Sequence, residues 1–182
     1  MKKAILALLI GLVCAPSAHA QGGAIVLSGD PQGSDCNIND SSAGMCAVYV
    51  VHVGISGAVA SQFAAPVPAC FAGTWLSDSP VFGVTVGNSQ SGVSIGYGQC
   101  TPGPIHVLTI NFFCQGLSEP CCYYSVVPHP DVTSGVVEAV DCMNNLLTAK
   151  GGFGIVNSTN ECECGPPTRD STWGRVKSIF DQ

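Results

Sequence analysis

The feature that most constrains the fold of this chain is its cysteine content, eleven residues of 182, taken together with its N-terminus. Two lysines precede an apolar stretch from Ala4 to Val13, and Ala18-His19-Ala20 supplies the small-x-small pattern that signal peptidase cleaves. The apolar stretch is shorter than the roughly 20 residues that a membrane-spanning helix needs. We therefore predict a signal peptide over residues 1–20 and an exported mature chain that begins at Gln21.

Removal of the signal peptide takes away Cys14 and leaves ten cysteines, an even number, in a chain bound for an oxidising compartment. This combination predicts disulfide bonds, each worth roughly 2–4 kcal/mol, rather than metal ligands or redox thiols. A bond within the adjacent pair Cys121-Cys122, or between Cys162 and Cys164, would be strained, so each of these cysteines should have a distant partner. The sequence does not fix the pairing among Cys36, Cys46, Cys70, Cys100, Cys114, Cys121, Cys122, Cys142, Cys162 and Cys164.

Short apolar runs separated by turn residues fill the stretch from Gln21 to Gly165, without a long helical period. This pattern is typical of an antiparallel sandwich or barrel. We predict an all-β fold in which residues 21–164 form a single disulfide-stapled β-sandwich of the jelly-roll or immunoglobulin-like type. The expected strands are 24–27, 46–53, 58–63, a hairpin over 81–97, 105–113, 122–127, 136–140 and 153–156, with a loop over 28–44 and a short helical turn over 144–148.

Two of these segments carry the clearest strand periodicity. In the hairpin, a loop from Gly87 to Gly92 separates two alternating runs, and we expect all six of their hydrophobic residues to share one face: Phe82, Val84, Val86, Val93, Ile95 and Tyr97. In the strand over 105–113, the same alternation places His106, Leu108, Ile110 and Phe112 on one side.

Charge is distributed unevenly along the chain. Between Gln21 and Thr168 the only basic residue is Lys150, whereas ten acidic residues lie between Asp30 and Glu163. A domain this acidic repels phosphate backbones, which excludes nucleic acid as a partner. The mature chain also has no stretch apolar enough to cross a membrane as a helix.

The C-terminal end differs in composition from the body. Residues 165–170 begin with Gly-Pro-Pro and predict a stiff linker, and residues 171–182 predict a short amphipathic helix. Trp173, Val176 and Phe180 would lie on one side of that helix, with Arg175 and Lys177 beside them. About twelve residues are marginal as an isolated helix. Two interpretations remain: a recognition segment presented to a partner, or a segment that packs on its own domain or stays disordered.

One pattern in the chain matches a catalytic motif. Gly92-Val93-Ser94-Ile95-Gly96 has the spacing of the serine hydrolase motif G-x-S-x-G, which places its serine at a sharp turn from strand to helix. Here Ser94 lies inside an alternating strand, and the residues that follow cannot begin a helix. A secreted serine hydrolase that uses Ser94 with His106 or His129 is therefore an alternative hypothesis, not the leading one.

A second alternative is a calcium-stabilised structural protein. Asp30, Asp35 and Asp40 crowd one predicted loop, and Asp35 to Asp40 has oxygen-bearing side chains at alternate positions, as in the opening of a calcium loop. The EF-hand pattern would require Gly at Asp40 and Glu at Cys46, and both positions fail. The acidic residues are otherwise explained as turn formers.

Several stretches resemble a known group of folds: 48–53, 60–63, 92–98 and 103–112 are similar to strands of the cohesin-like and carbohydrate-binding-type β-sandwiches of secreted bacterial proteins. The Thr-Trp-Gly-x-x-Lys segment from Thr172 to Lys177 is also similar to the ends of other small secreted bacterial proteins. The resemblance implies a jelly-roll sandwich with a binding role. It identifies no functional residue, and the ten cysteines depart from the cohesin pattern.

The sequence thus favours a non-catalytic module, secreted to the extracellular space or periplasm or held at the cell surface. We expect it to bind a protein or a glycan through its sandwich surface, or to build an extracellular assembly, without a cofactor other than calcium in the structural alternative. Trp75, Tyr123 and Tyr124 are the candidate aromatic residues for a contact surface, although each is equally compatible with the core.

Overall fold

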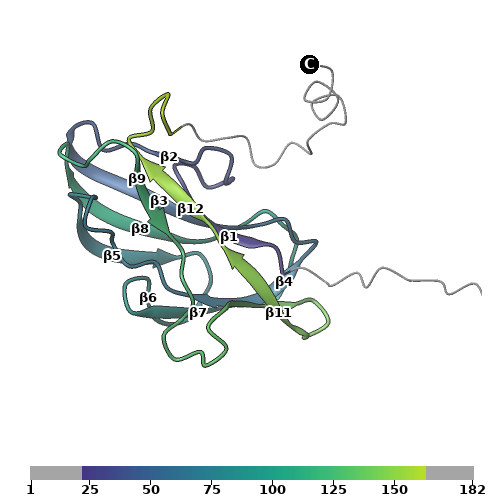
Figure 1. Cartoon of the computed structure of the whole chain (residues 1–182). Coiled ribbons are helices and arrows are strands. Elements are labelled where there is room, and N and C mark those ends of the chain that lie inside the picture. The colour runs from purple at the N-terminus through teal and green to yellow at the C-terminus, as the bar shows by residue number, and fades with distance from the viewer. Residues whose placement is uncertain (1–21, 163–182) are drawn as a thin grey trace, which may run out of the picture.

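The computed structural model describes residues 22–162, and all regular structure in this range is β-strand (Figure 1). The all-β fold predicted from the short alternating runs is confirmed. Within the described range, no helix is long and apolar enough to cross a membrane. The strands are β1 (Ala24–Ser28), β2 (Asn37–Ile38), β3 (Ala43–Val53), β4 (Ala58–Phe63), β5 (Thr74–Pro80), β6 (Val84–Asn88), β7 (Gly92–Thr101), β8 (Ile105–Gln115), β9 (Cys122–Ser125), β10 (Val137–Asp141), β11 (Leu146–Gly151) and β12 (Phe153–Val156).

The strands form two layers that are continuous at one edge. The first layer has the order β5-β8-β3-β1 and the second the order β11-β10-β4-β7-β6. They meet where β1 and β11 pair in parallel, at Ala24 opposite Lys150 and Ile25 opposite Gly151. A small sheet of order β2-β12-β9 closes one end of the sandwich (Figure 1).

Hydrophobic side chains from the inner faces of both layers pack into one cluster. Burying a large aliphatic or aromatic side chain contributes roughly 1.5–3 kcal/mol, so this cluster is the main driving force for the fold. Its fully buried members include, from the first layer, Ile25, Leu27, Val48, Val50, Leu108, Ile110 and Phe112, and from the second, Phe63, Val93 and Ile95.

Disulfide bonds link residues that are distant in sequence. The bonds Cys46–Cys114, Cys70–Cys122, Cys100–Cys142 and Cys121–Cys162 span 68, 52, 42 and 41 residues. Cys36 is also disulfide-bonded. The adjacent cysteines Cys121 and Cys122 have different, distant partners, as the sequence predicted, and the bonds fit an oxidising environment.

One predicted element is wrong: the helical turn over 144–148 is instead the start of strand β11. The carboxylate of Asp141 accepts hydrogen bonds from the backbone N–H groups of Met143 and Asn145, each at 2.8 Å. Asn144 adopts a left-handed φ of 63°. These features turn the chain directly from β10 into β11, so the short polar run forms a hairpin turn.

The predicted facing of the hairpin over 81–97 is also wrong. The register pairs Val84 with Gly96 and Val86 with Ser94. Val84 and Val86 therefore lie on the outer face, opposite Val93, Ile95 and Tyr97. The three residues between Asn88 and Gly92 set this register, and a loop of different parity would have placed all the hydrophobic residues on one side.

A β-bulge changes the facing of one residue in β8. The register shifts between Val50 and Val51, which pair with Leu108 and His106. Both Val107 and Leu108 are consequently buried, and His106 contacts Thr109 instead of sharing the side of Leu108. The segments predicted as signal peptide (1–20), linker (165–170) and C-terminal helix (171–182), together with Cys164, lie outside the described residues.

Candidate functional site

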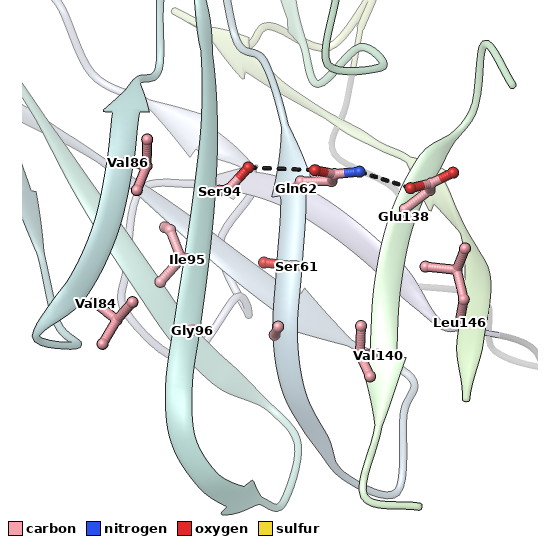
Figure 2. Close-up of a pocket in the computed structure, with 11 residues that line it drawn as sticks. Ser61, Gln62, Val84, Val86, Ser94, Ile95, Gly96, Glu138, Val140 and Leu146 are labelled. Atoms are coloured by element: carbon pink, nitrogen blue, oxygen red, sulfur yellow. Dashed lines mark hydrogen bonds between the residues drawn. The ribbon is translucent and has the colours of Figure 1, made fainter. Parts of the chain in front are cut away.

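The outer face of the second layer carries a row of apolar residues that crosses five strands. Successive registers place Val84 of β6 beside Gly96 of β7, Gly96 beside Ala60 of β4, Ala60 beside Val140 of β10, and Val140 beside Leu146 of β11. We call these five residues the aliphatic row. Its two smallest members lie in the middle and its larger members at the ends, so the row forms the floor and walls of a shallow groove (Figure 2).

This groove has a volume of about 280 Å³ and opens to solvent. Val84 and Leu146 are each 64% exposed, and Val86, beside the row on β6, is 71% exposed. Isolated exposed aliphatic residues are common on protein surfaces, so the gathering of several at one groove makes this face the candidate interaction surface.

A chain of polar side chains runs alongside the aliphatic row. The Ser94 hydroxyl donates to Gln62 Oε1 at 3.2 Å, and Gln62 Nε2 donates to Glu138 Oε2 at 2.6 Å (Figure 2). Ser134 donates its hydroxyl to the other oxygen of Glu138 at 2.9 Å. The carboxylate of Glu138 is thereby held at the edge of the groove, where it supplies a fixed negative charge.

A more polar hollow adjoins the groove and shares Gln62, Val86 and Ser94 with it. Its other walls include Gly92, His129 and Asp131. A side chain at Gly92 would meet the His129 ring at 2.6 Å, so glycine is needed for the histidine to pack here. The two hollows together form one surface, which we call the outer groove: apolar along the aliphatic row and acidic near Glu138 and Asp131.

The structure brings Ser94 and His129 to the same hollow but does not couple them. The Ser94 hydroxyl donates to an amide oxygen of Gln62, which cannot take its proton. His129 Nδ1 accepts the backbone N–H of Asp131 at 3.2 Å. Ser94 also lies within β7, not at a turn from strand to helix. The hydrogen-bond acceptor of Ser94 in this structure is therefore an amide oxygen of the polar chain and not the base that a nucleophilic serine uses.

The other histidines that the sequence singled out have structural partners. His52 is fully buried and its Nε2 donates to the carbonyl of Gly22 at 2.6 Å, while the Tyr97 hydroxyl donates to Ser61 at 2.8 Å beside it. Burial lowers the pKa of His52, because its charged form is poorly solvated there. His106 lies in the first layer against the Tyr49 ring, and partial burial lowers its pKa as well.

The three candidate contact aromatics are placed in different surroundings. Trp75 lies in edge strand β5, partly buried, and donates its ring N–H to Asp78 at 3.0 Å. Tyr124 is fully buried and donates its hydroxyl to the carbonyl of Ala65 at 2.8 Å. Tyr123 is 52% exposed and packs edge-to-face with Phe153 on the small sheet. The structure does not bring these residues together.

The candidate calcium ligands also have separate roles. Asp30 accepts hydrogen bonds from the backbone N–H groups of Gln32, Ser34 and Asp35 and so organises its own loop. Burial acts to raise the pKa of Asp30, but a hydrogen bond from the Ser34 hydroxyl together with these backbone bonds lowers it. Asp40 is buried and accepts the backbone N–H of Gly116 at 2.7 Å. Among the described residues, no group of three His, Cys, Asp or Glu side chains is arranged to hold a metal ion, and the calcium site stays a prediction.

Sequence reasoning missed the outer groove. The signal was present in β4, where Ala60 and Gln62 alternate with Ser61 and Phe63, and in the two valines of β6. Their alignment across five strands depends on four registers that no single segment specifies.

Comparisons with known proteins give a structural likeness only. No protein-family profile matches the chain, and no curated protein matches it in sequence. All the solved structures that we compare here are cohesin modules. The sixth cohesin of Acetivibrio cellulolyticus scaffoldin B, solved in complex with a Cel5 dockerin mutant, is 14% identical, with a TM-score of 0.47 over 76% of this chain and 100% of that one.

Two further cohesins match similarly. The module of a Clostridium perfringens family 33 glycoside hydrolase is 5% identical, with a TM-score of 0.45 over 75% of this chain and 99% of that one. A non-cellulosomal cohesin of Archaeoglobus fulgidus is 14% identical, with a TM-score of 0.44 over 76% of this chain and 93% of that one. The cohesin-like β-sandwich expected from the sequence agrees with these matches. Because the TM-scores lie below 0.5, we base function on this chain's own surface.

Proposed function

We propose that this chain is a non-catalytic binding module, exported from the cell, that holds a protein partner in the outer groove. The observation that carries the proposal is the aliphatic row. Its end residues, Val84 and Leu146, are exposed to solvent and line one continuous groove. Leaving this apolar surface in water is unfavourable by about 25 cal/mol per Å², so a partner that covers it gains free energy.

The chemistry of the outer groove favours a protein over a glycan. Its aliphatic residues offer apolar contact, and none of the described residues that line it is Phe, Tyr or Trp, the side chains on which sugar rings stack. The polar chain at its edge supplies amide, hydroxyl and carboxylate groups that can accept or donate hydrogen bonds at the rim. An apolar centre with a polar rim is the usual anatomy of a protein interface.

The hydrogen bonding of Ser94 supports a non-catalytic role. Its proton is directed to the amide oxygen of Gln62, and the polar chain continues to a carboxylate held by Ser134. We infer that the hydrogen-bonded side chains of Ser94, Gln62 and Glu138 fix the shape of the rim. A serine-reactive phosphonate probe should leave the folded protein unlabelled, and covalent labelling at Ser94 would support the hydrolase alternative instead.

Partner capture by paired variants tests the proposal. Val86→Asp combined with Leu146→Asp puts charge on two exposed positions of the outer groove, and Met45→Asp is the matched control at an exposed position of the first layer. We expect the double variant to lose proteins captured from the native culture and the control to keep them. Equal loss of captured proteins from the double variant and the control, or loss from the control alone, would contradict the assignment of the outer groove as the binding surface.

Export is part of the same proposal and has its own test. The disulfides fit an oxidising compartment, and the sequence places the cleavage site after Ala20. N-terminal sequencing of protein recovered from outside the cytoplasm should begin at Gln21. Recovery of a reduced, uncleaved chain from the cytoplasm would contradict export.

A further inference from the structure

We propose that residues 171–182 of a neighbouring copy occupy the outer groove, so that copies of the protein associate head to tail. This inference deepens the proposed function and rests on it. The first observation is the division of charge. Residues 22–162 hold nine acidic residues and a single basic one, Lys150, whereas residues 171–182 hold two basic side chains, Arg175 and Lys177, and one acidic side chain, Asp181. The acidic domain therefore attracts the basic pair Arg175 and Lys177 of the segment.

The outer groove matches this segment in polarity. The aliphatic row offers apolar contact to Trp173, Val176 and Phe180, which share one side of the predicted helix. Glu138 and Asp131 lie at the acidic side of the groove, where basic residues flanking the apolar stripe can reach them. The apolar and the charged parts of the segment thus each have a counterpart.

The two surfaces also match in length. Neighbouring strands are about 4.8 Å apart, so the aliphatic row from β6 to β11 spans four intervals, or about 19 Å. A helix over residues 171–182 would be about 18 Å long, at 1.5 Å per residue. Since a helix this short is marginal alone, a surface that buries its apolar stripe would stabilise it.

The position of the chain end favours a neighbouring copy over the same copy. The described chain ends at Cys162, at the opposite end of the sandwich from β6 and β7 (Figure 1). Eight residues lie between Cys162 and Ser171, and their nine Cα–Cα steps reach at most about 32 Å when fully extended. A sandwich of this size is about 37 Å across, judged from its expected radius of gyration of about 14 Å. The tether is thus shorter than its own domain is wide, and the Pro166-Pro167 pair favours an extended linker.

The decisive experiment mixes two variants of the full-length mature, oxidised protein. Trp173→Ala with Phe180→Ala removes the apolar stripe but leaves the outer groove intact. Gly96→Val fills the groove but leaves the tail intact; a Cβ at Gly96 meets only Val84, at 3.5 Å, which is an ordinary contact distance. Leu146→Asp, at an exposed position, is the second groove variant in case Gly96→Val fails to fold.

Sedimentation velocity should show wild-type association that grows with concentration, and each variant alone should associate about tenfold or more weakly. An equimolar mixture should form a one-to-one complex that stops at two chains, because only one intact tail and one intact groove meet. Met45→Asp should associate like the wild type. Raised salt should weaken association, because part of the attraction is between charges.

Three results would overturn the inference: a wild-type protein that stays monomeric at all concentrations, variants that still associate alone, or a mixture that forms no complex. A monomeric wild type in which the tail cross-links to the outer groove of the same copy counts as the first of these results. If the wild type is monomeric while groove substitutions still abolish capture of another protein, the inference fails and the proposed function stands. If the groove variants change neither association nor capture, both fail.

Discussion

The outer faces of the two layers use their polar and apolar groups in different ways. In the first layer, Asn111 of β8 donates to the Ser79 hydroxyl at 2.9 Å, and His106 bonds Thr109 at 3.0 Å, so polar side chains on this face bond one another. In the second layer, the polar chain is confined to one side of a groove whose other side is aliphatic. The same alternating strand pattern thus builds one face on which polar side chains bond one another beside the exposed pair Met45 and Phe113, and another face that carries an aliphatic groove.

The largest expected effect comes from the disulfide that staples the second layer. Replacing Cys100 and Cys142 by serine removes a 42-residue constraint and should cost about 4 kcal/mol of unfolding free energy. It should also loosen β7 against the end of β10 and weaken binding at the outer groove. Denaturant unfolding and partner capture, at a temperature where the variant stays folded, measure both effects.

The matched comparison is the disulfide of the first layer, Cys46–Cys114, which spans 68 residues. Its removal should cost a similar unfolding free energy and leave binding by the folded protein unchanged. Equal weakening of binding in the two variants would mean that the layers do not differ in function.

The next largest effect is on binding alone. Gly96→Val fills the floor of the outer groove and should weaken partner binding about tenfold or more, equivalent to at least about 1.4 kcal/mol. The unfolding free energy should change by less than this amount, because the added side chain meets only Val84. Isothermal titration with the captured partner, beside thermal unfolding, separates the two quantities. Unchanged affinity would show that the partner does not bind in the outer groove.

A smaller effect, with the opposite pattern, is expected on the first layer. Asn111→Ala removes the hydrogen bonds to Ser77 and Ser79 and should lower the unfolding free energy by about 1 kcal/mol. Because the substitution leaves the outer groove untouched, partner capture should be unaffected. A loss of capture in this variant would break the contrast between the faces.

The smallest expected effect is a pH dependence of the unfolding free energy that arises from His52, a buried residue between the two layers. Burial lowers the folded-state pKa of His52, so its contribution to stability is present above the unfolded pKa of about 6.5 and is lost as the pH falls below it. For one histidine, the loss between pH 7 and pH 6 is at most about 0.7 kcal/mol. Unfolding free energies of the wild type and His52→Gln should differ in this slope, which His106 also influences. Identical slopes would show that His52 does not control the response.

The sequence predicted the elements that depend on local patterns. Long alternating or apolar runs, as in β3 and β8, gave strands close to those observed, and the distant disulfide partners of Cys121 and Cys122 followed from bond geometry. Edge strand β5 was missed because Thr74–Pro80 is mostly polar and exposed, so it lacks a buried face to reveal it.

The features that sequence reasoning missed depend on register. The facing of Val84 and Val86 follows from the loop length after Asn88, whose side chain accepts the backbone N–H groups of Gln90 and Ser91. The aliphatic row requires four such registers at once. Since a shift of one residue in any strand reverses its facing, the outer groove is a property of the assembled sheet.

The most direct test of the central claim places a photo-cross-linking residue at single exposed positions in the native host. We choose Val84 and Leu146 at the outer groove, and Met45 and Leu117 as exposed controls elsewhere. The proposed occupancy of the outer groove predicts covalent protein adducts from the two groove positions and none from the controls. Adducts from Met45 or Leu117 with none from the groove would contradict it.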